Sequence, residues 1–425
     1  MKIVISSDIY YPMINGVASF SRNLAAGLHQ RGHEVLVLAP SITGKFGVEK
    51  DHEFGFKVAR LSSFKMPLYP DQINEVPEAK GFLGVKIPQL IYKNGMHVSL
   101  GSYTEIRDLL DDFEPDIIHD QTPGPVALAV FRYAKRRNIP LVSTDHAYPD
   151  NLTQQLKLPK LAKQPINKLM NEYFISFLRR SEYATMPTEQ AISDLIPKNR
   201  RFFKVTVEAL SNGIDLSRFK PGRPKAEIFQ KYQLPKNAEI VLYVGRVDPE
   251  KSLDVLMQAF IGVAKERPEA QLVVVGDGTA RPKLEEMAAD AGLTTRVHFT
   301  GRVVGDDLPQ LYRTAKLFAI TSKTETQSIV LLEAMASGLP CVAVKAGAIP
   351  ELVATGVNGF LCSADDVTCV AKAIEQILAA KDEDYAAMSQ QSLAKAKTHD
   401  ITHTLSRIEE IYESVLEARR KSEIS

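Results

Sequence analysis

LFAITSKTETQSIVLLEAMASGLPCVAV, residues 317–344, contains two apolar runs separated by a polar loop and a helix-like segment. The helix-like segment begins near Ser328, and Gly338 and Pro340 follow it as helix-ending residues do. A strand, a helix and a second strand in this order predict two parallel strands joined by a helical crossover.

The same alternation occurs throughout the chain. In the first half, apolar runs and helical patterns alternate over 2–6, 16–31, 34–40, 116–120, 125–137 and 140–146. In the second half, the pattern restarts over 239–245, 252–266, 271–276, 296–301, 317–322 and 339–344. The sequence therefore predicts an α/β fold with two Rossmann-like domains, residues 1–205 and 206–401. A turn-rich join lies near 205–225, and 60–103 is read as a less regular insertion.

The composition limits the class of protein. The chain has 425 residues, 44% of them hydrophobic and 24% charged, with a formal net charge of +1. This balance is typical of a globular protein and gives no overall field that would favour nucleic acid. No apolar run approaches the ~18 residues that span a bilayer, and MKIVISSDIYYP does not resemble a signal peptide. With three cysteines that lack metal-site spacing, we expect a reducing, cytoplasmic location.

Glu325 lies in the polar loop of the opening stretch, and Glu333 lies inside its apolar helix. Carboxylates accept hydrogen bonds from vicinal hydroxyls, and the N-terminus of a helix attracts phosphate. Two acids beside such a helix end could hold the two sugars on either side of a pyrophosphate, as in a nucleotide-sugar. The alternative is a capping acid together with a partly buried, paired Glu333.

The stretch YVGRVDPEKSLD, residues 243–254, provides cations at another strand end. Arg246 can bind a phosphate through two hydrogen bonds, and Lys251 adds a point charge. The alternative is that these are ordinary loop charges paired with Asp248 and Glu250.

Together these motifs resemble the retaining GT-B glycosyltransferases of family four. The resemblance includes SNGID at 211–215 and GVNGFL at 356–361, and it covers nearly the whole chain. It implies two Rossmann-like domains facing a cleft, a nucleotide-sugar held mainly by the C-terminal domain, and a tail helix, about 402–425, that returns to the N-terminal domain.

The resemblance also assigns roles to residues. Arg246 and Lys251, after Gly245, match the diphosphate ligands; Glu325 matches the contact to the donor sugar, and Glu333 matches the ligand of the ribose hydroxyls. Further donor contacts are expected from Gln327, Ser328, Ile329, Arg302 and Val303. Ser252 and the sequence TQSI replace glycines common in the family, which leaves the identity of the donor sugar open.

In the first half, Gly16 lies at a strand-to-helix turn, where glycine allows a ligand to approach the backbone. The resemblance places this loop against the donor phosphate or the acceptor, although Gly16 could be a simple turn residue. His146 follows the strand 140–146 and matches a histidine near the transferred sugar. His119 also ends a strand, and we expect it to shape the site rather than to react.

We expect neither a metal nor a cofactor. Acid doublets occur at 111–112, 306–307 and 365–366, but each lies beside or within a helical pattern and is interpreted as a solvated face or a cap. The predicted catalytic group is His146, Glu325, Arg246 and Lys251, and the donor is a UDP- or GDP-sugar.

The segment 156–180 indicates the acceptor. Lys157, Lys160 and Lys163 lie among leucines, and Pro159 and Pro165 interrupt the segment. Near an anionic membrane each cation could add about 1 kcal/mol, which favours a lipid acceptor and a peripheral position on the inner face of the cell membrane. A solvated basic loop is the alternative. A weaker likeness to bacterial diacylglycerol glucosyltransferases points to a lipid acceptor.

The sequence allows three other functions to be compared with this one. The same chemistry could act on a soluble sugar or metabolite. A dehydrogenase would need a complete dinucleotide fingerprint, and GDGTARPK at 276–283 has only two of its glycines. A nucleotide-sugar-binding protein without turnover would not need both Glu325 and Glu333.

Overall fold

The computed structural model spans the 425 residues and divides into two compact units. Unit 1 comprises Met1–Leu210 and Thr404–Ser425, and unit 2 comprises Ser211–His403. The residues described are 1–13, 15–66, 72–76, 79–80, 86–87, 90–94, 96–100, 102–146, 160–196 and 204–424, with side chains undescribed within 72–94, 160–163 and 423–424. The sequence placed the boundaries at 205/206 and near 402, and the contacts place them after Leu210 and after His403.

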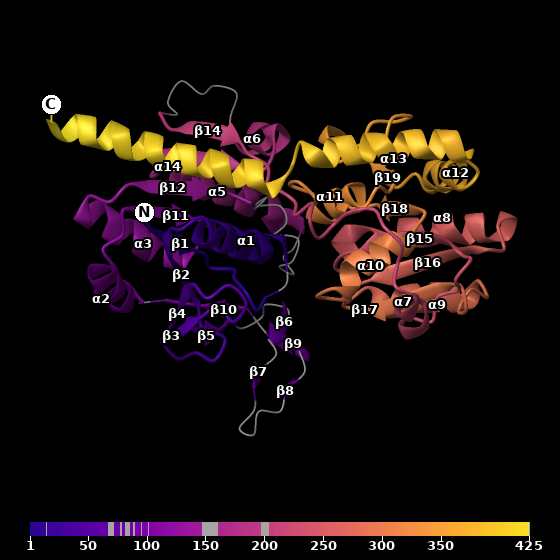
Figure 1. The fold of residues 1–425 in the computed structure, drawn as a ribbon, viewed down its shortest axis with the longest axis horizontal. Coiled ribbons are helices and arrows are strands. Elements are labelled where there is room, and N and C mark those ends of the chain that lie inside the picture. Colours follow the sequence, from indigo (N-terminus) through magenta and orange to yellow (C-terminus); the bar gives the residue numbers. More distant parts are fainter. Residues whose placement is uncertain are drawn as a thin grey trace. The chain divides into compact units, whose positions relative to one another are not determined.

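Unit 1 is built on an eight-stranded sheet with the order β14-β13-β12-β11-β1-β2-β4-β3 (Figure 1). All neighbouring strands are parallel except β3 and β4. The strands are β1 (Lys2–Ser6), β2 (Glu34–Pro40), β3 (Gly47–Lys50), β4 (Lys57–Leu61), β11 (Ile117–Asp120), β12 (Leu141–Thr144), β13 (Tyr183–Met186) and β14 (Thr206–Ala209). The helices are α1 (Gly16–Gln30), α2 (Tyr103–Phe113), α3 (Pro125–Arg137), α5 (Lys160–Leu178), α6 (Glu189–Leu195) and α14 (Ile401–Ile424).

Parallel strands covered by helices on both faces are buried along their whole length, so they appear in the sequence as continuous apolar runs. Ile3, Val4 and Ile5 of β1 are fully buried, and Val35 to Ala39 of β2 are almost fully buried. The predicted strands and the helices of the α/β alternation are confirmed to within a few residues.

The insertion at 60–103 is more regular than its prolines and glycines suggested. It contains three antiparallel pairs, β5 (Phe64–Lys65) with β10 (His97–Val98), β6 (Gln72–Val76) with β9 (Leu90–Asn94), and β7 (Ala79–Lys80) with β8 (Lys86–Ile87). Main-chain pairing needs no apolar pattern, so composition alone did not reveal these strands.

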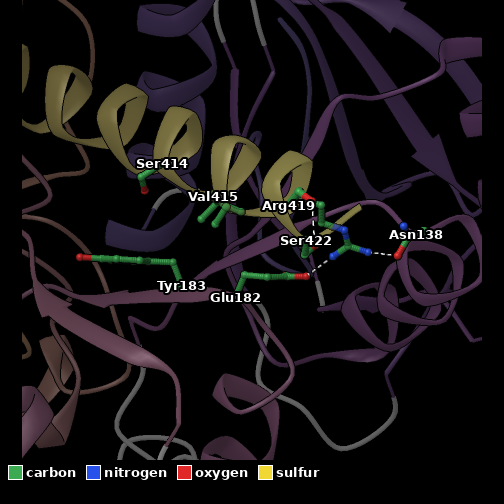
Figure 2. Close-up of a pocket in the computed structure, with 8 residues that line it drawn as sticks. Asn138, Glu182, Tyr183, Ser414, Val415, Arg419 and Ser422 are labelled. Atoms are coloured by element: carbon green, nitrogen blue, oxygen red, sulfur yellow. Dashed lines mark hydrogen bonds and ion pairs between the residues drawn. The ribbon is translucent and has the colours of Figure 1, made fainter. Parts of the chain in front are cut away.

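The tail helix α14 packs on unit 1, as predicted. Its side chains at Leu405, Ile408, Ile411, Tyr412 and Val415 are buried. Near its end, Arg419 donates to Glu182 Oε1 at 2.5 Å and also bonds Asn138, beside a cavity of about 460 Å³ (Figure 2). This cavity contains none of the residues predicted for the donor site.

Unit 2 contains a six-stranded, fully parallel sheet with the order β17-β16-β15-β18-β19-β20 (Figure 1). Its strands are β15 (Glu239–Val244), β16 (Ala270–Val275), β17 (Val297–Gly301), β18 (Leu317–Ile320), β19 (Cys341–Val344) and β20 (Gly359–Cys362). Its helices are α7 (Ala226–Lys231), α8 (Leu253–Glu266), α9 (Arg281–Asp290), α10 (Asp307–Thr314), α11 (Ile329–Ala336), α12 (Val367–Leu378) and α13 (Asp382–Lys397), with 3₁₀ turns η2 (Pro249–Lys251) and η3 (Ile349–Glu351). In chain order this is the 3-2-1-4-5-6 Rossmann arrangement, whose direction reverses between β15 and β18.

Two expectations need correction. Cys362 and Cys369 form a disulfide, and Cys341 is free and buried, so the cysteines do not support the reducing setting that was expected from them. Pro165 does not interrupt the segment after Lys160, because it lies inside α5.

Lys157 lies outside the described residues, and Lys160 and Lys163 are described only as backbone of α5. In the described part of the chain, no helix combines the length and the apolar character needed to cross a membrane.

Candidate active site

Most of the predicted donor residues of unit 2 lie where the strand order reverses. β15 and β18 are neighbours, with Val241 opposite Leu317 and Leu242 opposite Phe318. The loop after β15 carries Arg246 and Lys251, and the loop after β18 carries Glu325. Ligands of open α/β sheets bind beyond the carboxyl ends of the strands at this reversal.

Lys251 and Glu325 form an ion pair across these two loops. Lys251 Nζ donates to Glu325 Oε1 at 2.7 Å, and the side chains are only 16% and 12% exposed. The backbone of Glu325 is fixed as well, because its carbonyl accepts a hydrogen bond from Ala348 N at 3.0 Å. Gly347 lies against the same peptide with a φ of 50°, and a Cβ there would lie 2.5 Å from the Glu325 carbonyl oxygen. Three strand-end loops therefore fix the position of this acid.

Arg246 is held by the two acids that sequence analysis offered as its partners. Its guanidinium donates to Asp248 Oδ2 at 2.7 Å and to Glu250 Oε1 at 2.5 Å. Asp248 also accepts hydrogen bonds from the backbone N–H and the hydroxyl of Thr279. The cation is thus oriented by its own loop, and a bound anion would have to share it with these carboxylates.

Glu333 lies in the second turn of α11, and Tyr312 of α10 donates to its Oε2 at 2.7 Å. Burial raises the pKa of Glu333 to about 7, although Tyr312 and Arg218 act in the opposite direction. A carboxyl group with a pKa near neutrality exchanges a proton within the physiological range. Glu333 therefore has the partner that the alternative interpretation expected, and it retains an oxygen, Oε1, with which it could accept a further hydrogen bond.

The N-terminus of α11 carries polar groups that lack partners. Ser328 caps the helix with a φ of 64°, and its hydroxyl is buried without a hydrogen-bond partner among the described residues. The hydroxyls of Ser322 and Thr324 in the same loop are also buried without one. Buried hydroxyls are nearly always hydrogen-bonded, so three on one loop beside a helix N-terminus indicate a place for an anionic or hydroxylated ligand.

The other predicted donor residues occupy distinct positions. Ile329 is the first residue of α11, while the buried side chain of Gln327 accepts from Asn212 N at 2.8 Å and donates to Ser211 at 2.8 Å. The Gln327 side chain therefore holds the loop against Ser211 and Asn212, and the group predicted to contact the donor is its backbone N–H. Arg302 is half-buried and Val303 is buried, directly after the edge strand β17.

Gly245, after β15, packs against the end of the neighbouring strand β16. Its N–H donates to the Val275 carbonyl at 2.9 Å, and Gly276 lies so close that a Cβ there would be 1.8 Å from the Gly245 carbonyl oxygen. Two adjacent glycine-containing turns thus bring the ends of β15 and β16 close together, which a side chain at 276 would prevent.

The predicted residues of unit 1 lie at the carboxyl edge of its own sheet. Gly16 is the exposed first residue of α1, after the capping residue Asn15. His146 is buried, its Nε2 lies 3.1 Å from Gln121 Oε1, and its ring is 4.8 Å from that of Phe20 on α1. His146 is thus anchored to the same helix that Gly16 begins.

Both ring nitrogens of His119 have partners within unit 1. Its ring nitrogens lie 2.7 Å from the Tyr412 hydroxyl and 2.7 Å from the Thr144 hydroxyl. Burial lowers the pKa of His119 to about 3, so the ring is neutral and links β11 to α14 and β12.

Two buried acids of unit 1 escaped the sequence analysis. Asp8 follows β1 and accepts from Val126 N at 3.0 Å, and burial raises its pKa to about 7. Asp120 ends β11, accepts from the Ser6 hydroxyl at 2.7 Å, and burial raises its pKa well above the usual value. Each ends an apolar run at the point where the strand order of unit 1 reverses, and this was the signal that could have identified them.

The acid doublets behave as caps and surface pairs. Asp366 accepts from Cys369 N at the start of α12, Asp307 pairs with Lys231 at 2.5 Å, and Asp111 pairs with Arg137 at 2.6 Å. Within the described residues, no group of three or more His, Cys, Asp or Glu side chains is arranged to hold a metal ion.

Two family models match most of the chain. The model for Glycosyltransferase Family 4 matches residues 14–218, and the model for glycosyl transferases group 1 matches residues 224–395. The first match falls largely in unit 1 and the second lies within unit 2.

Characterised relatives agree with this assignment. A GDP-mannose-dependent alpha-mannosyltransferase of Corynebacterium glutamicum is 27% identical over 86% of this chain and 78% of its own length. Alpha-monoglucosyldiacylglycerol synthase of Streptococcus pneumoniae is 27% identical over 81% of this chain and 71% of its own length. Anabaena Alr3699/HepE, solved with UDP-glucose, is 21% identical with a TM-score of 0.70 over 97% of this chain and 100% of that chain, which shows a shared fold. The chain is a GT-B glycosyltransferase that uses nucleotide-sugars, and it belongs to the enzymes that combine a family 4 region with a group 1 region.

Proposed function

We propose that this enzyme is a retaining hexosyltransferase that moves glucose or mannose from a UDP- or GDP-sugar to a hydroxyl group of a membrane lipid such as diacylglycerol. The observation that carries the donor part is the loop after β18. There Glu325 pairs with Lys251, and three buried hydroxyls without partners among the described residues lie beside the N-terminus of α11. Relatives that act on GDP-mannose or form monoglucosyldiacylglycerol support the choice of hexose and lipid.

Each donor residue has a role in the proposal. Lys251 and Arg246 neutralise the diphosphate, and the backbone N–H groups of Gln327, Ser328 and Ile329 donate to the phosphates and the sugar. Glu325 accepts from hydroxyls of the hexose, and Glu333 accepts from those of the ribose. Arg302 and Val303 contact the base.

In the proposed reaction, the acceptor oxygen attacks C1 of the hexose on the face from which the diphosphate departs. The bond between C1 and the phosphate oxygen breaks, the new C1–O bond forms, and the leaving phosphate oxygen takes the acceptor proton. The protein positions the reactants and stabilises the charge that develops on the diphosphate, which two cations can do without a metal ion. His146 and the turn at Gly16 complete the proposal as contacts of the transferred sugar and of the donor phosphate or acceptor.

We propose that the enzyme acts at the cytoplasmic face of an anionic membrane, which it contacts through Lys157, Lys160 and Lys163. The basic composition of the segment 156–163 supports this proposal.

A nucleotide-release assay tests the function. UDP-, GDP- and ADP-sugars are crossed with diacylglycerol, phosphatidylinositol and soluble sugar acceptors, with and without EDTA. We expect release only with a hexose donor and a lipid acceptor, unchanged by EDTA, and an anomeric NMR signal that retains the donor configuration. Release with soluble acceptors alone would refute the lipid assignment, and an inverted product would refute the mechanism.

A further inference from the structure

A second group of cations lies in unit 1, on the helices α2 and α3. A pocket of about 230 Å³ opens between α2 and α3, which pack side by side (Figure 1). It is lined by Tyr103, Arg107, Arg136 and Arg137. Sequence analysis gave these arginines no role.

Tyr103 organises the positive charge. The guanidinium carbon of Arg132 lies 4.7 Å from the centre of the Tyr103 ring, and that of Arg136 lies 5.4 Å from it. Arg136 also donates to the Tyr103 hydroxyl at 3.0 Å. Cation–π contacts hold a guanidinium in place without neutralising it, so both groups keep their charge and most of their donors.

The acids nearby compensate only part of this charge. Arg107 donates to Asp108 at 2.7 Å, and Arg137 pairs with Asp111 at 2.6 Å. Among the residues that the structure describes, no acid forms an ion pair with Arg132 or Arg136. Three guanidinium groups line the pocket, a fourth, that of Arg132, lies over the Tyr103 ring, and only two of the four form ion pairs with carboxylates of the described residues.

We propose that this pocket binds a phosphate group. Clustered like charges repel one another, and an anion relieves that repulsion. Guanidinium groups present paired N–H donors that fit the oxygens of a phosphate, and the ring of Tyr103 fixes two of them in advance. The pocket belongs to unit 1, whereas the residues proposed to bind the nucleotide belong to unit 2.

The phosphate can belong to a lipid headgroup or to a soluble compound. Leu128 lies one helical turn before Arg132 on the same face of α3 and is 39% exposed. Leu100, three residues before Tyr103, is 62% exposed. Apolar side chains beside a phosphate site suit a bilayer surface, so Leu128 distinguishes the two sources.

The test compares the full-length protein with Arg132→Gln/Arg136→Gln, and with Lys265→Gln/Lys372→Gln, which removes two exposed charges from unit 2. Sedimentation with phosphatidylcholine vesicles, with and without phosphatidylglycerol, gives the lipid arm. Line broadening of inorganic phosphate in ³¹P NMR gives the soluble arm. If each charge contributes about five-fold to the binding affinity, the arginine pair should bind about 30-fold more weakly, either to the vesicles or to inorganic phosphate. The lysine pair should bind about two-fold more weakly or less.

Leu128→Ser identifies the source. If vesicle binding falls several-fold and phosphate binding is unchanged, the ligand is a lipid headgroup; if neither changes while the arginine pair loses phosphate binding, it is soluble. Arg132→Lys/Arg136→Lys keeps both charges but loses the paired donors and the stacking on Tyr103, so its binding should lie between that of the wild type and that of Arg132→Gln/Arg136→Gln; circular dichroism checks that all variants fold. Unchanged binding of the arginine pair in both arms, or an equal loss in the lysine pair, overturns the proposal. Because no arm measures turnover, that failure leaves the proposed reaction untouched.

Discussion

Lys251 donates a hydrogen bond to Glu325 at 2.7 Å, although the two residues are 74 positions apart in the chain. They meet because β15 and β18 are neighbours, which places the loops after both strands at one edge of the sheet. The pair keeps a cation and an acid in place without a ligand. On binding a diphosphate, we expect Lys251 to exchange the carboxylate for phosphate, which frees Glu325 to accept hydrogen bonds from sugar hydroxyls.

Replacing Lys251 with Ala should lower kcat by about 10²–10³-fold, the usual cost of removing one electrostatic contact to a developing charge. It should also lower the free energy of unfolding by about 2 kcal/mol, because Glu325 loses its partner while only 12% exposed. Lys251→Ala/Glu325→Ala should regain most of the stability and none of the activity. Nucleotide release and urea unfolding measure the two quantities, and wild-type turnover of Lys251→Ala would contradict the assigned role.

The pKa of Glu333 makes two quantities depend on pH. Because burial raises that pKa from 4.5 to about 7, the folded state favours the protonated acid. The contribution of protonated Glu333 to the free energy of unfolding is complete below about pH 4.5 and is lost as the pH rises through about 7. Glu333→Gln should therefore flatten the fall in the free energy of unfolding across this window, as urea titrations at several pH values will measure.

Ionisation of Glu333 should strengthen donor binding, although it lowers the stability of the fold. An ionised carboxylate accepts hydroxyl hydrogen bonds better than a protonated one, so the KM for the donor should fall as the pH rises through about 7. Glu333→Gln should have a higher KM that does not change over this range. A variant that keeps the wild-type pH profile would show that Glu333 does not bind the donor.

The sequence predicted what is local. Buried parallel strands such as 2–6 and 34–40 are continuous apolar runs, and Gly338 and Pro340 mark the end of α11 within the chain itself. The strand-end positions of Arg246, Lys251 and Glu325 followed from the same patterns. The sheet order was needed to show which of them meet.

Contacts between distant segments were beyond the sequence. His119 and His146 both lie near the carboxyl ends of strands, but Tyr412, 293 positions from His119, fixes that ring in the core. Asp8 is buried because the N-terminus of α3 reaches it through Val126. Neither contact leaves a pattern in the adjacent residues, so no window of sequence could have predicted it.

The disulfide between Cys362 and Cys369 should stabilise unit 2. It joins the end of β20 to the first turn of α12 across a separation of seven residues. Closing so short a loop in the unfolded chain contributes roughly 2 kcal/mol, so Cys362→Ser, Cys369→Ser and the double variant should each lose about that much. Thiol counting in denaturant should give one group, Cys341, without reductant and all three cysteines after reduction. Three thiols without reductant would contradict the bond.

Gly276 and Gly262 form a matched test of the turn that encloses Gly245. Gly276 has a φ of 140°, and a Cβ there would lie 1.8 Å from the Gly245 carbonyl oxygen, so Gly276→Ala must push β15 and β16 apart at the site. We expect a loss of about 2–4 kcal/mol from strain and displacement, together with a raised KM for the donor, because Arg246 follows the displaced peptide. Gly262 lies within α8 with no neighbouring atom within 4 Å of its Cβ position, so Gly262→Ala should stabilise the protein by about 0.5–1 kcal/mol and leave KM unchanged. Thermal unfolding and donor titration separate the two variants. If Gly276→Ala were as stable as Gly262→Ala, the backbones at 245 and 276 would be able to separate without cost. The donor loop would then not depend on the contact between them.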